Sequence, residues 1–111
     1  MRIGYFADGP WGHNTLEKLV ERNDVKVVFV IVRFDYRDET LIKMSEKYDI
    51  PCFWLEDINA PESIQKIKTF NPDLLVSMSF NQIIKKELIN LCEEKFINCH
   101  AGKLPSYRGR N

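Results

Sequence analysis

The order of segments along this chain predicts an α/β fold with one doubly wound, mostly parallel sheet and helices on both faces. Strand-like apolar runs alternate with helical patterns, and that alternation implies right-handed βαβ crossovers. The second apolar run, Val25 to Val32, is almost continuously apolar and β-branched, as in a strand covered on both faces. At 111 residues the chain forms one domain or part of one.

Five apolar runs are predicted to form the strands. They lie at Arg2 to Ala7, Val25 to Val32, Ile50 to Leu55, Leu74 to Met78 and Lys95 to Cys99. The fourth run follows Asn71-Pro72-Asp73, which ends the preceding helix because proline disfavours helical backbone before it.

The first two helices are predicted from their starting residues and apolar faces. After a loop at Asp8 to His13, Asn14 or Thr15 caps the first helix. Its apolar face contains Leu16, Leu19 and Val20. Asp38 opens the second helix in the same way. One side of that helix contains Leu41, Ile42, Ser45 and Tyr48.

The last two helices are predicted from their sequence spacing. Asn59-Ala60-Pro61-Glu62 starts the third helix, since proline is tolerated in a first turn and glutamate favours the positive end of the helix dipole. Ile64 and Ile67 then face inward. Ile84, Leu88 and Leu91 recur at helical spacing and indicate the fourth helix.

Composition narrows the classes of protein. Sixteen basic residues balance sixteen acidic ones, and a formal net charge of zero argues against general nucleic-acid binding. Cys52, Cys92 and Cys99 lack the spacing of a disulfide framework or a zinc site, which favours reduced thiols in the cytoplasm. The amino-terminal residues do not resemble a signal peptide, and no apolar run approaches the ~20 residues of a membrane span.

Ligands of open α/β sheets bind beyond the carboxyl ends of the strands. Three loops are expected there, at Asp8 to His13, Ser77 to Ile84 and Cys99 to Asn111. The first loop lacks the spaced glycines of a dinucleotide fingerprint, so binding of NAD or FAD through that motif is not expected.

Two interpretations of the first loop stay open. In one, a helix N-terminus at Asn14 holds a phosphate through backbone N–H groups and Trp11 stacks on a base. In the other, the loop is a tight turn and Trp11 packs on the sheet edge. His13 has no evident partner in the sequence and is predicted to be a loop residue.

The second loop contains Ser79-Phe80-Asn81-Gln82-Ile83-Ile84. Its backbone groups suit a flat heterocycle that lies on apolar side chains. The simpler interpretation is that Asn81 or Gln82 caps the following helix.

The third loop carries the strongest signal. Period-two alternation at the end of the last strand puts Asn98 and His100 on one face and Cys99 on the other. An amide that holds a carbonyl, beside an imidazole that moves protons near neutral pH, suits acyl transfer to an amine. Lys103, Arg108 and Arg110 follow with Tyr107 among them, as an anion site or as a solvated loop.

The run from Phe96 to Asn111, Phe-Ile-Asn-Cys-His-Ala-Gly-Lys-Leu-Pro-Ser-Tyr-Arg-Gly-Arg-Asn, closely resembles the signature of the formyltransferases that use 10-formyltetrahydrofolate. That family includes methionyl-tRNA, glycinamide ribonucleotide and sugar N-formyltransferases. The segment Ser79 to Leu88 resembles the family's folate-side loop and helix. The resemblance implies a Rossmann-like formyltransferase fold, with residues 1–111 as the amino-terminal part of the catalytic domain and no second domain.

The resemblance also implies roles for individual residues. Asn98 matches the asparagine that holds the formyl oxygen, and His100 matches the histidine that assists proton transfer. The catalytic aspartate of the family lies later in sequence than Asn111. The family's folate pocket is lined largely by backbone, which here would be that of Phe80, Asn81, Gln82, Ile83 and Ile84, with Leu104 and Pro105 nearby. The residues expected to contact the acceptor are Trp11, Lys103, Tyr107, Arg108 and Arg110.

Formyl transfer from 10-formyltetrahydrofolate to a primary amine, without a metal, is the expected reaction. The sequence of the last loop favours the amino group of a nucleotide-linked sugar as acceptor, with methionyl-tRNA as the alternative. A folate- or nucleotide-binding module without turnover is the alternative from another class, because the family's aspartate is not among these residues.

Overall fold

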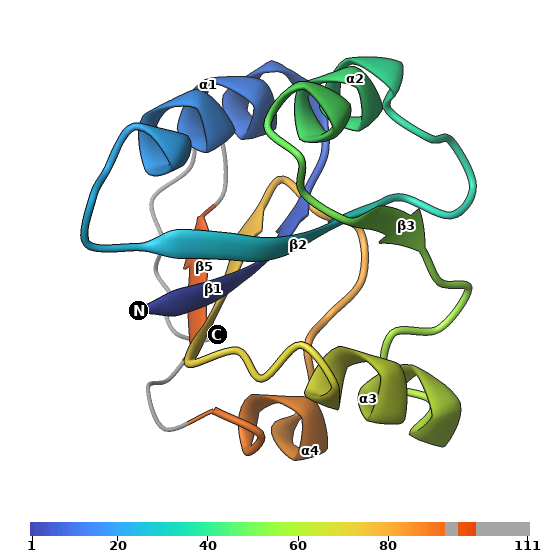
Figure 1. Ribbon diagram of the computed structural model, residues 1–111. Coiled ribbons are helices and arrows are strands. Elements are labelled where there is room, and N and C mark those ends of the chain that lie inside the picture. The colour runs from blue at the N-terminus through green and yellow to red at the C-terminus, as the bar shows by residue number, and fades with distance from the viewer. Residues whose placement is uncertain (93–95, 100–111) are drawn as a thin grey trace.

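Figure 1 shows the computed structural model of the protein, in which a twisted sheet lies between two layers of helices. The structure describes residues 1–92 and the backbone of residues 96–99. The predicted fold class is confirmed, because the described strands form one parallel sheet with helices on both of its faces. No helix in the described ranges combines the length and the apolar character that a membrane crossing needs.

The sheet contains five strands among the described residues, in the order β3-β2-β1-β4-β5. Their bounds are β1 Arg2–Ala7, β2 Lys26–Val32, β3 Cys52–Trp54, β4 Leu74–Met78 and β5 Phe96–Cys99. The chain moves outward from β1 to β2 and β3, then returns to β4 on the other side of β1. The order of the strands therefore reverses between β1 and β4, at the centre of the sheet.

The helices α1 (Gly9–Val20) and α2 (Glu39–Lys47) cover one face, and α3 (Pro61–Lys68) and α4 (Lys86–Ile89) cover the other (Figure 1). The predicted starts of α2 and α3 are confirmed, and Asp38 Oδ1 accepts a hydrogen bond from the N–H of Leu41 at 3.0 Å. Proline at the start of α3 fits the first turn, where its missing N–H leaves no bond unmade.

The predictions for α1 and α4 were wrong in their bounds. Helix α1 begins at Gly9, so most of the predicted loop is helical and Asn14 lies inside the helix. Pro10 in the first turn starts the helix early, and Gly9 takes a φ of +78° that suits glycine. Helix α4 is a single turn that excludes Ile84 and Leu91.

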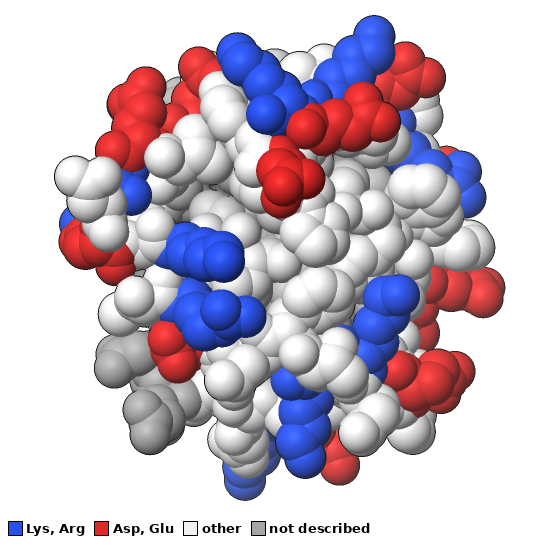
Figure 2. All heavy atoms as spheres, viewed as in Figure 1, with Lys and Arg blue, Asp and Glu red and all other residues white. Residues whose placement is uncertain are grey.

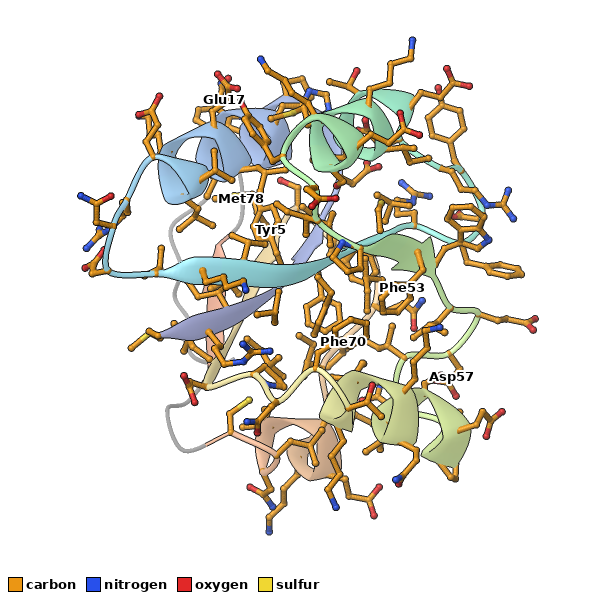
Figure 3. The ribbon with its side chains drawn as sticks, viewed as in Figure 1. Tyr5, Glu17, Phe53, Asp57, Phe70 and Met78 are labelled. Carbon is orange, nitrogen blue, oxygen red and sulfur yellow. The ribbon has the colours of Figure 1, made fainter. Side chains whose placement is uncertain are left out.

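The side chains of the sheet enter two separate apolar clusters. On the side of α3 and α4, Phe29 lies at the centre of a ring cluster with Phe6, Phe53 and Phe70, at centroid distances of 5.3 to 5.8 Å. Figure 3 shows Phe53 and Phe70 between the sheet and α3. The other cluster, on the side of α1 and α2, includes Tyr5, which is fully buried.

Candidate functional site

The carboxyl ends of β1 and β4 lie side by side where the strand order reverses. The N–H of Asp8, the residue after β1, donates to the carbonyl of Met78 at the end of β4, at 3.2 Å. Ser79 follows Met78, so Asp8 and Ser79 leave the sheet at the same point. In open α/β sheets this reversal opens the crevice in which ligands bind.

Two buried polar atoms at this point have no hydrogen-bond partner among the described residues, Asp8 Oδ1 and Ser79 Oγ. Burial raises the pKa of Asp8, and the guanidinium of Arg33, 3.8 Å from Asp8 Oδ2, offsets that effect only in part. Ser79 also has a φ of +60°, which a non-glycine residue rarely adopts. A carboxyl oxygen and a hydroxyl in this position suit a ligand that both donates and accepts hydrogen bonds.

Asp38 links the start of α1 to the start of α2. Its carboxylate accepts hydrogen bonds from the N–H of Gly9 at 2.9 Å and from Nε2 of His13 at 2.8 Å, besides the cap of α2. A carboxylate is only an acceptor, so Nε2 of His13 carries the proton. The prediction that His13 is an unpartnered loop residue was therefore wrong, since His13 lies in α1 and pairs with Asp38.

Replacing Asp38 with alanine is expected to lower the free energy of unfolding at pH 7 by about 1–2 kcal/mol, because the cap of α2 and the bonds to α1 are lost. Burial alone would raise the pKa of Asp38, but the hydrogen bonds from His13, Gly9 and Leu41 outweigh it and hold the pKa below its ordinary value. The stabilisation is therefore present above the unfolded pKa of ~3.9 and is lost as the pH falls through the lower folded pKa.

Urea unfolding at pH 7 and pH 3 measures this prediction. The difference in the free energy of unfolding between wild type and Asp38→Ala should be smaller at pH 3 than at pH 7. The control is Glu39→Ala, an exposed acidic residue in the first turn of the same helix. A gap of the same size at both pH values contradicts the assignment of the carboxylate.

The segment from Ser79 to Lys85 leaves the sheet beside this point and packs against the α3 and α4 side. Phe80 is half-buried against Phe6, with ring centroids 5.7 Å apart, and Ile84 is 4% exposed. Ile83 is 79% exposed. Lys85 is the N-cap of α4, so the prediction that Asn81 or Gln82 caps this helix was wrong.

Trp11 lies in the first turn of α1 and is 57% exposed, so it does not pack on the sheet edge as one interpretation of the loop expected. Its exposed ring is free to stack, as the other interpretation requires. The interpretation that a helix N-terminus at Asn14 holds a phosphate was wrong, because the amino-terminal end of α1 is at Gly9.

The backbone of β5 carries Asn98 to the same edge of the sheet. Asn98 pairs with Ser77 and Cys99 with Met78, so β5 ends beside the exit of β4. The side chain of Asn98 lies outside what the structure describes, as does all of His100. Further predicted site residues outside the described residues are Lys103, Leu104, Pro105, Tyr107, Arg108 and Arg110. A common face for Asn98 and His100 stays a prediction.

Metal ligation has no candidate in the part of the chain that the structure describes: no group of three or more His, Cys, Asp or Glu residues there could hold an ion. Burial raises the pKa of Cys92 to about 11 and also raises that of Cys52. Neither thiol is therefore an activated nucleophile.

The sequence matches the family described as formyl transferase over residues 1–111. It is 37% identical to the methionyl-tRNA formyltransferase of Citrifermentans bemidjiense, over 98% of this chain and 36% of the relative. Its identity to the methionyl-tRNA formyltransferase of Clostridium acetobutylicum is 36%, over 98% of this chain and 37% of the relative. The chain thus spans little more than a third of the length of these relatives.

Solved structures with the same fold include glycinamide ribonucleotide transformylase 1 from Symbiobacterium toebii, with a TM-score of 0.72 and 17% identity over 98% of this chain and 55% of that one. Phosphoribosylglycinamide formyltransferase from Anaplasma phagocytophilum gives a TM-score of 0.70 and 24% identity, over 99% of this chain and 54% of that one. At these identities the likeness concerns the fold.

Proposed function

The chain belongs to the formyl transferase family, whose members are enzymes, and on that premise we propose that it carries the donor side of a site that transfers a formyl group from 10-formyltetrahydrofolate to a primary amine. The match to the family over residues 1–111 is the observation that carries this proposal. We propose in addition that residues 1–111 are the amino-terminal part of the catalytic domain and that the protein acts in the cytoplasm.

Methionyl-tRNA is the acceptor that we propose. The sequence favoured the amino group of a nucleotide-linked sugar, but the relatives at 36–37% identity are methionyl-tRNA formyltransferases, which supports the alternative. Figure 2 shows basic and acidic side chains intermixed around an uncharged central area, in keeping with a net charge of zero. Attraction to the tRNA backbone would therefore come from local cations, for which Lys103, Arg108 and Arg110 are our candidates.

We propose that the donor binds beyond the carboxyl end of β4. We also propose that the backbone of Phe80 to Ile84 lines the folate pocket, with Leu104 and Pro105 nearby. Two features support that assignment: this segment leaves the sheet where the strand order reverses, and Ser79 Oγ and Asp8 Oδ1 are buried there without a partner in the described part of the chain. A folate ring carries both donors and acceptors, so these atoms fit it chemically.

Asn98 and His100 would carry out the chemistry. The amide of Asn98 donates a hydrogen bond to the formyl oxygen, where negative charge develops as the amine nitrogen attacks the carbon. His100 takes the proton that the amine loses, and a proton is returned to the folate nitrogen when its bond to the formyl carbon breaks. Formylated amine and tetrahydrofolate leave, with no net gain or loss of electrons.

A formylation assay on the protein as its gene encodes it tests this function. The donor is 10-formyltetrahydrofolate, and the two acceptor arms are methionyl-tRNA and a nucleotide-linked amino sugar. We expect formylmethionyl-tRNA. Formylation of the sugar alone would show that the sugar, and not methionyl-tRNA, is the acceptor. Binding of 5-formyltetrahydrofolate without turnover of either acceptor would overturn the enzymatic proposal in favour of a binding module.

A further inference from the structure

Two amide side chains connect the loop after β3 to the loop after β4. Asn59 donates from Nδ2 to the carbonyl of Ile83 at 2.7 Å and accepts through Oδ1 from the N–H of Lys85 at 2.9 Å. Gln82 reaches in the opposite direction. Its Nε2 donates to the carbonyl of Leu55 at 3.1 Å, and its Oε1 accepts from the N–H of Ile58 at 2.9 Å. We call these four bonds the amide clamp.

The clamp requires amides. Each side chain meets one backbone N–H, which can only donate, and one backbone carbonyl, which can only accept. Each amide therefore has a single orientation that satisfies both partners. A carboxylate in the place of Asn59 would keep the bond from Lys85 and would set its second oxygen against the carbonyl of Ile83. That contact is repulsive, because both oxygens are acceptors.

The clamped segment has little local structure to hold it. It begins at Ser79, whose φ is +60°, and it leads into α4, a single turn whose N-cap makes no side-chain hydrogen bond. A helix of one turn is not stable by itself. Within the segment, Ile83 is 79% exposed while its neighbour Ile84 is 4% exposed. The bonds at Ile83 and Lys85 lie on either side of Ile84 and fix which of these two side chains faces out.

We infer that Asn59 and Gln82 are positioning residues for the folate donor, which they serve by holding the backbone of residues 80–84 in the shape that receives its ring. This inference rests on the proposed function. Neither amide needs to touch the donor, because each acts through its two hydrogen bonds to the backbone. A loop that is already ordered loses less conformational entropy when a ligand binds, so the clamp should act on donor affinity.

The test uses Asn59→Asp in the protein as its gene encodes it, with 5-formyltetrahydrofolate as the probe in calorimetry. We expect the dissociation constant for the probe to rise about tenfold, together with the KM for the donor, while kcat at saturating donor stays close to wild type. The matched control is Asn90→Asp, the same chemical change at an exposed residue at the end of α4, which should leave the dissociation constant unchanged.

If Asn59 had a purely structural role, the urea midpoint of Asn59→Asp would fall with no selective loss of donor affinity. Gln82→Glu is the second variant, and if both amides hold one loop, the double variant should lose less affinity than the sum of the single losses. Equal affinity of Asn59→Asp and Asn90→Asp for the probe would overturn the inference while leaving the proposed function standing. A wild-type protein that does not bind the probe would end both.

Discussion

Replacing His100 with alanine is expected to lower kcat by about two to four orders of magnitude and to leave the affinity for 5-formyltetrahydrofolate close to that of the wild type. In the proposed reaction the attacking amine must lose a proton, and a neutral imidazole is a base that can accept it. The donor ring is assigned to a different part of the chain, residues 80–84, so binding and turnover should separate.

Steady-state formylation assays measure kcat, and calorimetry measures the affinity for 5-formyltetrahydrofolate, both on the protein as its gene encodes it. His13→Gln is the control for loss of a histidine, because His13 contacts Asp38 and has no assigned part in proton transfer. Asn98→Ala should also lower kcat, through loss of the hydrogen bond to the formyl oxygen. Unchanged turnover in His100→Ala would remove this residue from the reaction.

Replacing Phe29 with alanine is expected to lower the free energy of unfolding by about 3–5 kcal/mol. The side chain is fully buried and contacts the rings of Phe6, Phe53 and Phe70. It also lies against Gly4 so closely that a Cβ added there would come within 2.3 Å of the Phe29 ring. Removing the ring therefore leaves a cavity that the rigid centre of the sheet cannot close.

Urea unfolding followed by circular dichroism gives the free energy for this comparison. The control is Phe34→Ala, at a position where the ring is 39% exposed, and its cost should stay below about 1 kcal/mol. Because the free energy of unfolding of a single domain is about 5–15 kcal/mol, the Phe29→Ala variant should be only marginally stable. A cost for Phe29→Ala no larger than that for Phe34→Ala would contradict the assignment of this ring to the core.

Local sequence patterns predicted most of the fold because a buried strand appears in the sequence as a run of neighbouring apolar residues. The runs at β1 and β4 were predicted at their observed bounds, and Asp38 as the cap of α2 followed from its side chain and position. The start of α1 was missed because Gly9 and Pro10 are also turn-forming residues. The length of α4 was not predicted. The amide clamp binds the carbonyl of Ile83 and the N–H of Lys85, and a longer helix would need these backbone groups for its own hydrogen bonds.

The site was less predictable than the fold, since its contacts join residues distant in sequence. The pairing of His13 with Asp38 spans 25 positions, and the bond from Asn59 to Ile83 spans 24. No local pattern marks either partner. Asn98 and His100 stood out for a different reason, because their resemblance to a family signature supplied information that spacing alone does not contain.

The partition of the sheet's side chains has a consequence for engineering. Among the described residues the two apolar clusters share no member. Phe80 and Ile84, which anchor the loop assigned to the donor, belong to the cluster under α3 and α4, whereas α1 and α2 rest on the other. A library that varies positions under α1 and α2 would therefore change residues outside the cluster that holds the donor loop.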